Sequence, residues 1–232
     1  MLDTLTALDD RVMVALNSHF TEWTDAFMWY FSGKLTWVGF YLCLLWAIKL
    51  RYGWRRSLGI LVVIALVITL CDQACGHWVR DAVARLRPSN PANPISPLIH
   101  TVNGYRAGAY GFPSCHAANS FGLAVFVSLL FKYRPVTLLM FAWAVVTAYS
   151  RIVLGVHYPG DLMVGACAGS IIAAVVYFIA KKVYYHYREN CAPWASRGHD
   201  CSRAESLRWI CGGLLLTVVG IVLMATVTVS MS

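Results

Sequence analysis

Six long apolar stretches, separated by short polar segments, constrain this chain more than any other feature of its sequence. Hydrophobic residues make up 59% of the 232 residues and charged residues only 13%, whereas an ordinary soluble domain is about 25% charged. A soluble core could not bury so much apolar surface, and a transmembrane helix needs roughly 20 mostly apolar residues. The sequence therefore predicts a single all-α integral membrane domain over residues 1–232.

The predicted transmembrane helices cover residues 35–50, 58–78, 117–131, 136–153, 162–180 and 207–229. Another segment, residues 20–30, is rich in aromatic side chains but too short and too polar to span a bilayer. We expect it to form an interfacial helix with its aromatic rings at head-group depth. The expected architecture is a six-transmembrane-helix bundle with an N-terminal interfacial helix.

The distribution of basic residues predicts the orientation of this bundle. Twelve of the 19 lysines and arginines, Arg197 among them, lie in the connections after the first, third and fifth predicted helices or at the helix ends that border them. The positive-inside rule places these connections in the cytoplasm and the connection 79–116 outside. Because the net charge of +8 is spread over short segments between apolar runs, it fits anionic lipid head groups and not a nucleic-acid partner. We expect a bacterial inner-membrane protein whose outer face is periplasmic or exterior.

Three polar clusters stand at the outer ends of the predicted helices, and alternation of the helices brings all three to one membrane face. They are Arg80, Arg87 and Pro88 after the second helix; Pro113, Ser114, Cys115 and His116 before the third; and Ser150, Arg151, His157 and Asp161 between the fourth and fifth. Convergence of this kind predicts a site at the mouth of the bundle.

The residue types in these clusters suit phosphoryl transfer. Arginines present fork-shaped donors that match phosphate oxygens, and a helix that begins near Ser114 favours an anion at its N-terminus. His116 and His157 supply two groups that can exchange protons. Asp161 lies four residues after His157, about one helical turn, so its carboxylate can orient the imidazole.

The motifs Arg80-x6-Arg87-Pro88, Pro113-Ser114-Cys115-His116 and Ser150-Arg151-x5-His157-x3-Asp161 resemble the three-part signature of the type 2 phosphatidic acid phosphatase superfamily. They span residues 80–161, and the six-helix pattern resembles the membrane branch of that superfamily over nearly the whole chain. Three motifs in the right order are far more specific than any one alone. The resemblance implies an integral-membrane lipid phosphatase.

The resemblance also implies a role for each residue. His157 would attack phosphorus and carry a transient phosphohistidine, Asp161 would orient it, and His116 would protonate the leaving oxygen. The phosphate oxygens would be bound by Arg80, Arg87, Ser114, Arg151 and the backbone N–H of Cys115. No metal or other cofactor is expected, because the arginines neutralise the phosphate charge.

Two positions depart from the family pattern. Arg80 stands where the first motif usually has lysine. The arginine keeps the positive charge and adds a bidentate fork of donors. Cys115 stands where the second motif usually has glycine. A side chain there would crowd the phosphate if the backbone required a positive φ.

Other interpretations of the polar residues remain open at this stage. Arg85 and Arg106 are expected to extend toward lipid phosphates, and Asp72 to hydrogen-bond between helices. His77 and Asp81, also four residues apart, are expected to form a structural pair. A zinc site at His116, His157 and Asp161 is disfavoured because the nearby arginines would repel a cation.

The leading functional prediction is a phosphatase that acts on undecaprenyl diphosphate, lipid A or a phosphoglycerolipid. One alternative is a non-catalytic lipid-binding or transport protein. Another is an enzyme like the vanadate-dependent haloperoxidases, which six membrane spans disfavour. The sequence carries no mark of a protein partner or an oligomeric state.

Overall fold

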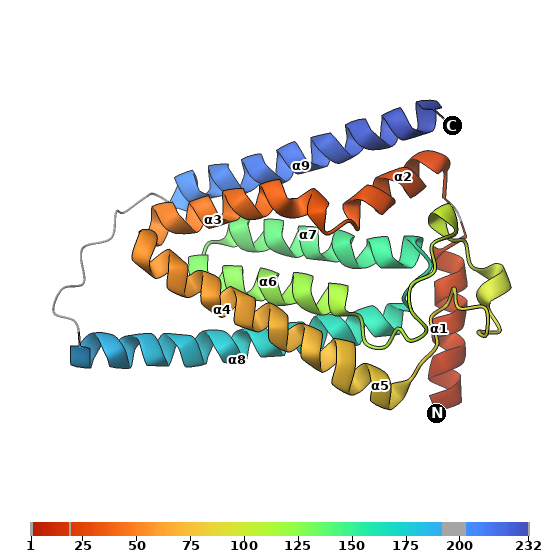
Figure 1. Cartoon of the computed structure of the whole chain (residues 1–232), viewed down its shortest axis with the longest axis horizontal. Coiled ribbons are helices and arrows are strands. Elements are labelled where there is room, and N and C mark those ends of the chain that lie inside the picture. The colour runs from red at the N-terminus through yellow and green to blue at the C-terminus, as the bar shows by residue number, and fades with distance from the viewer. Residues whose placement is uncertain (1, 19, 192–202, 232) are drawn as a thin grey trace.

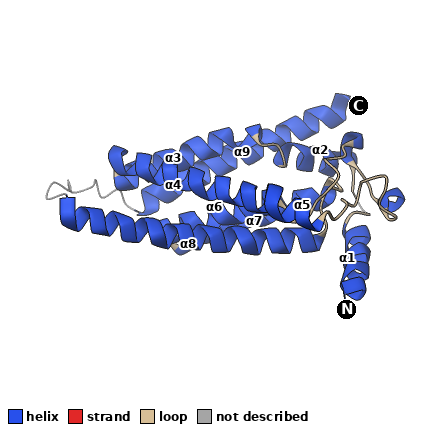
Figure 2. Cartoon of the chain, turned by 60° about the horizontal axis from the view of Figure 1, so that its bottom comes forward, coloured by secondary structure: helices blue, strands red, loops and turns tan. Residues whose placement is uncertain are grey.

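The structure is a computed structural model that describes residues 2–18, 20–191 and 203–231, and these ranges are dominated by helices (Figures 1 and 2). In chain order the α-helices are α1 (Leu2–Leu16), α2 (Glu22–Phe31), α3 (Val38–Tyr52), α4 (Trp54–Gln73), α5 (Val79–Val83), α6 (Cys115–Phe131), α7 (Arg134–Val153), α8 (Pro159–Cys191) and α9 (Arg203–Met231). The segment 192–202, which holds the Arg197 used in the orientation argument, lies outside the described residues.

Every predicted transmembrane segment falls on one of these helices. The first begins with a single 3₁₀ turn, Leu35–Trp37, and the second continues from α4 through a wider π-helical turn, Ala74–Trp78, into α5. The prediction of an all-helical membrane protein is confirmed. By length and composition, four of the described helical stretches can cross a membrane: Trp54–Val83, Arg134–Val153, Pro159–His186 and Ala204–Met231.

The count of six spans stays a prediction. A fifth crossing requires α2 and α3 to act together, although the chain bends by 69° between them, and α6 is a shorter apolar helix. The predicted interfacial segment corresponds to α2. That helix begins where Thr21 accepts from the Thr24 backbone N–H at 3.3 Å and its own N–H donates to the Thr24 hydroxyl at 2.8 Å, a reciprocal cap.

Helix α6 is the centre of the bundle, with α4, α7 and α8 packed around it (Figure 1). Two glycines of α8 permit the closest of these contacts. A Cβ on Gly165 would lie 2.4 Å from the Ser114 carbonyl oxygen, and a Cβ on Gly169 would lie 2.0 Å from that of Ala118. Small residues at this spacing let helix backbones approach each other in a membrane.

The opposite faces of the outer helices are apolar and exposed. Large apolar side chains such as Leu66 of α4, Phe178 of α8 and Leu216 of α9 are 48%, 57% and 73% exposed. Lipid chains would cover them in a bilayer, which explains why the long spans are mostly unburied within the protein.

Helix α1 is not a membrane span and lies across one end of the bundle (Figures 1 and 2). Its Met13 is fully buried. The Asn17 side chain donates to the carbonyls of Ile152 and Val153 at 2.8 and 3.1 Å and accepts from the His100 backbone N–H at 2.7 Å. Helix α1 is therefore docked firmly against the end of α7, beside the irregular chain between α5 and α6.

Candidate active site

The three sequence clusters meet at the end of the bundle where α1 lies. Arg80 comes from α5, Arg87 from the loop that follows, Ser114 and His116 from the start of α6. Arg151 is in the last turn of α7, His157 in the short α7–α8 loop, and Asp161 in the first turn of α8. The predicted convergence of these residues is therefore observed.

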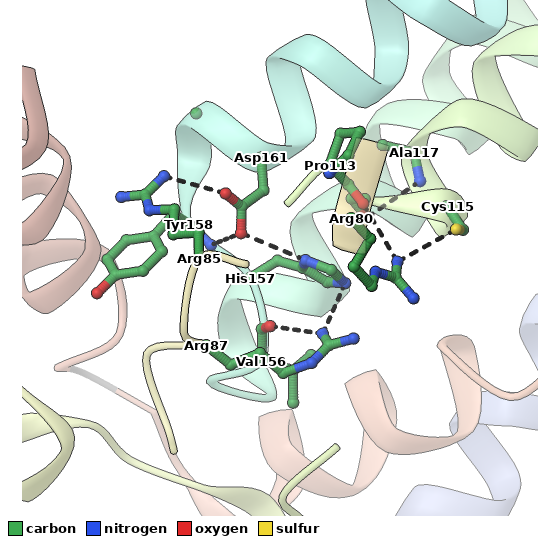
Figure 3. Close-up of polar contacts among 12 residues, drawn as sticks. Arg80, Arg85, Arg87, Pro113, Cys115, Ala117, Val156, His157, Tyr158 and Asp161 are labelled. Carbon is green, nitrogen blue, oxygen red and sulfur yellow. Dashed lines mark hydrogen bonds and ion pairs between the residues drawn. The ribbon is translucent and has the colours of Figure 1, made fainter. Parts of the chain in front are cut away.

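His157 lies between an acid and an arginine (Figure 3). Its Nδ1 is 3.4 Å from Oδ2 of Asp161, and its Nε2 is 2.9 Å from Nη1 of Arg87. Arg87 is itself fixed, because its Nε donates to the Gly108 carbonyl and its Nη1 to the Val156 carbonyl, both at 2.8 Å. His157 is only 2% exposed and Asp161 is fully buried.

This geometry defines the protonation of the ring. An arginine can only donate, so Nε2 of His157 accepts from Arg87 and the proton of the neutral ring is on Nδ1, facing Asp161. Burial lowers the pKa of His157 well below its ordinary value of 6.5, and the charges of Arg87, Arg151 and Arg80 lower it further. The imidazole is thus uncharged at neutral pH, with the lone pair of Nε2 directed toward an arginine.

The arginines form a buried positive cluster. Burial and the neighbouring charges of Arg80 and Arg151 lower the pKa of Arg87 to about 10, so it remains charged at neutral pH. Arg80 Nε and Arg151 Nε are buried and have no hydrogen-bond partner among the described residues. Buried donors without acceptors are costly, and an anion with several oxygens would satisfy them.

The start of α6 lies beside the arginine cluster, since Arg80 contacts Pro113 and Cys115. Ser114 is fully buried and caps the helix by accepting from the Ala117 N–H at 3.4 Å. Cys115 has ordinary helical backbone, because the positive-φ residues of the described chain lie elsewhere. Its side chain is thus accommodated, with Sγ 3.2 Å from Nη2 of Arg80. The steric conflict that a positive φ would have caused at this position does not arise.

His116 faces two cavities. One, of about 330 Å³, is lined by Arg151, Tyr105 and Lys34 as well as His116. The other, of about 460 Å³, runs from His116 and Cys115 between the helices and is lined mainly by apolar side chains. The site therefore opens into two recesses, one beside Arg151 and the other between the helices along apolar side chains.

Sequence reasoning missed the role of Arg85. Its Nη1 lies 3.0 Å from Oδ1 of Asp161 and 2.8 Å from Oδ2 of Asp9 in α1, so it does not extend freely toward lipid. Its position between Arg80 and Arg87 in the first motif could have indicated a role in the site. No local pattern could have indicated Asp9, since 152 residues separate it from Asp161.

The remaining polar residues play smaller parts. Asp72 accepts from the Asn119 side chain at 2.9 Å, which links α4 to α6 as expected. His77 and Asp81 are exposed and line neither cavity. Among the described residues there is no group of three or more histidine, cysteine or acidic side chains that could hold a metal ion.

Residues 58–185 match the family model described as the PAP2 superfamily, which is more than half of the chain. The chain belongs to the PAP2 superfamily. It is 40% identical over 227 residues to a lipid A 4'-phosphatase of Bacteroides thetaiotaomicron, covering 98% of this chain and 99% of that one. It is also 32% identical to a lipid A 4'-phosphatase of Porphyromonas gingivalis over 78% of this chain and 75% of the relative.

More distant PAP2 relatives extend the comparison. An undecaprenyl-diphosphatase of Sulfolobus acidocaldarius is 33% identical over 55% of this chain and 57% of its own length. The crystal structure of a PAP2-type phosphatidylglycerolphosphate phosphatase from Bacillus subtilis superposes with a TM-score of 0.54 at 20% identity, covering 82% of this chain and 89% of that one. This PAP2 protein is therefore a membrane lipid phosphatase, a hydrolase of phosphate esters.

Proposed function

We propose that this protein removes a phosphate group from a glycolipid of the lipid A type, at the outer face of the bacterial inner membrane. The observation that carries the proposal is the 40% identity to a lipid A 4'-phosphatase over nearly the full length of both chains. The outer location follows from the charge bias of the connections. Undecaprenyl diphosphate and phosphoglycerolipids are the other substrates to test.

The two cavities suit a phosphate attached to a large amphipathic molecule. The apolar cavity of about 460 Å³ begins at His116 and is walled by side chains of α3, α4, α6 and α7. It could receive part of the lipid while the phosphate reaches the arginines. A phosphatase for small soluble esters would not need an apolar recess beside its site.

In the first step of the proposed reaction, Arg87 gives up its hydrogen bond to Nε2 of His157 and donates to a phosphate oxygen instead, and the freed Nε2 attacks phosphorus. The N–P bond forms as the P–O bond to the lipid breaks, and His116 gives its proton to the leaving oxygen. Asp161, on the Nδ1 side, stabilises the positive charge that develops on the His157 ring. The buried arginines bind the phosphate oxygens whose charge changes in the transition state.

In the second step, His116 takes a proton from a water molecule, which attacks phosphorus and breaks the N–P bond. Inorganic phosphate leaves and His157 returns to its neutral form. Arg80, Arg87 and Arg151 hold the transferring group throughout, assisted by Ser114 and the backbone N–H of Cys115. The balance of protons closes without a redox step or an added cofactor.

Phosphate release by the detergent-purified protein tests this proposal. Wild type and His157→Ala are assayed in excess EDTA on lipid A, undecaprenyl diphosphate and phosphatidylglycerol phosphate. We expect wild type to prefer lipid A and the variant to release no phosphate. Full activity of a folded His157→Ala protein would refute the mechanism, and preference for another lipid would refute the substrate assignment. Loss of activity in EDTA with recovery in magnesium would refute metal independence.

A further inference from the structure

Arg85 connects the nucleophile's carboxylate to the N-terminal helix. Its Nη1 contacts Asp161 Oδ1 at 3.0 Å and Asp9 Oδ2 at 2.8 Å, and its guanidinium lies over the Tyr158 ring, 3.8 Å from the centroid. The Arg85 and Asp9 side chains are 23% and 15% exposed, against 1% for Asp161. Figure 3 shows Arg85 on the side of Asp161 away from His157.

The two oxygens of Asp161 have different partners. Oδ1 accepts from Nη1 of Arg85, while Oδ2 accepts from the Tyr158 backbone N–H at 3.1 Å and faces Nδ1 of His157 at 3.4 Å. A bond to Oδ1 prevents the carboxylate from rotating and presents Oδ2 to the imidazole. The charge of Arg85 also compensates the buried carboxylate of Asp161, because a buried charge without a partner is costly.

Asp9 holds Arg85 in turn. Its Oδ2 pairs with Arg85, and its Oδ1 accepts from the Gly160 N–H in the first turn of α8 at 2.9 Å. Helix α1 has separate contacts through Met13 and Asn17 that keep it docked. Asp9 can therefore be changed without removing the main anchors of α1.

We propose that Arg85 is a positioning residue that, fixed by Asp9 of α1, holds Asp161 in the orientation that aligns His157 for attack. The N-terminal helix is then part of the catalytic apparatus and more than a surface anchor. The role rests on the proposed function, because it assumes that His157 is the nucleophile. Arg85 itself touches no phosphate in this account, which separates it from Arg80, Arg87 and Arg151.

The positioning role predicts a specific kinetic pattern. Arg85→Met should lower kcat by roughly 100-fold, the scale of a misplacement of about 1 Å, with little change in KM because the phosphate-binding arginines are intact. Arg85→Lys should recover part of the rate by restoring a cation. Asp9→Asn should give a smaller fall in kcat, since it loosens Arg85 without removing its charge. Arg106→Met, which removes an exposed arginine of the same outer loop, should leave kcat unchanged.

The test measures kcat, KM and thermal unfolding of these four variants with lipid A, together with ¹⁵N spectra of labelled His157. Wild type should show an Nδ1 proton directed at Asp161. Arg85→Met should keep this tautomer, because Arg87 still donates to Nε2, but should shift the Nδ1–H signal as Asp161 moves, with an unchanged unfolding temperature. The proposal is overturned if Arg85→Met keeps kcat within about threefold. It is also overturned if kcat and the unfolding temperature fall together in Arg85→Met and Arg85→Lys restores neither kcat nor the unfolding temperature.

The spectroscopic arm separates this proposal from the proposed function. The Nδ1–H signal of His157 can be read with no substrate present. If wild type cleaves none of the lipids, the proposed function fails, and an unchanged Nδ1–H signal in Arg85→Met would still overturn the positioning role. If wild type is active on a lipid other than lipid A, the same four variants are compared on that lipid.

Discussion

Ser114 donates its backbone N–H to the backbone carbonyl of Asp161 at 3.0 Å, which joins the first turn of α6 to the first turn of α8. The two helices thus bring the His116 motif and the His157 motif together through main-chain atoms. This contact depends on how closely α8 approaches α6. The glycines at 165 and 169 make that approach possible.

Gly169→Ala should therefore damage both stability and activity. The new Cβ would lie 2.0 Å from the Ala118 carbonyl oxygen, so α8 must move away from α6 and carry Asp161 with it. The direction of the stability change is informative, because alanine normally stabilises a helix by about 1 kcal/mol relative to glycine. Thermal unfolding and phosphate release measure the effect. Gly212→Ala in α9, where a Cβ meets nothing within 4 Å, is the matched control and should lose neither.

Arg80 should tolerate lysine better than a neutral side chain. Its Nη2 donates to the Pro113 carbonyl at 3.2 Å, and its buried Nε lacks a partner among the described residues. Arg80→Met removes charge-assisted bonds to the phosphate, so kcat/KM should fall by about 10- to 100-fold. Arg80→Lys, which restores the residue usual in the family, should lose less. Equal losses in the two variants would show that Arg80 serves packing and not phosphate binding.

The acid side of the pH–rate profile should reflect the buried state of His157. The charges that face this ring are Arg80 of α5, Arg87 of the outer loop, Arg151 of α7 and the opposing Asp161 of α8. Because burial and the arginines lower its pKa, the nucleophile remains unprotonated well below pH 6.5. For a substrate with constant ionisation, the acid-side decrease of kcat/KM should therefore be centred well below pH 6.5. A fall centred at pH 6.5 would contradict the geometry of His157.

The same shift has a consequence for stability. The folded state keeps His157 neutral, whereas the unfolded chain takes up a proton near pH 6.5. The contribution of His157 is therefore fully present above the unfolded pKa and is lost progressively as pH falls below it. The unfolding temperature of wild type should decline below pH 6.5 more steeply than that of His157→Gln, which has no such proton to bind.

The sequence predicted the parts of this site that are local. The four-residue spacing of His157 and Asp161 indicated the acid–imidazole pair, and the apolar stretches located the helices that carry the motifs. The sequence separated the segment 20–30 from the helix at 35–50, but it did not indicate how the two pack at the 69° bend, where the rings of Phe31 and Trp37 lie 4.7 Å apart, edge to face. Arg85 was assigned to lipid because its partner Asp9 is distant in sequence. A pairing of that kind becomes visible only once the chain is folded.

Detection of a phosphorylated His157 is the decisive test of the proposed mechanism. Lipid A carrying radiolabelled phosphate is mixed with excess protein, quenched in alkali within one turnover, and the labelled peptide is identified by mass spectrometry. We expect transient label on His157 in the wild type and none in His157→Ala. His116→Ala should form the intermediate slowly and release phosphate from it slowly, since the same histidine serves both steps. Phosphate release by wild type with no label on the protein, or with label on another residue, would contradict the account.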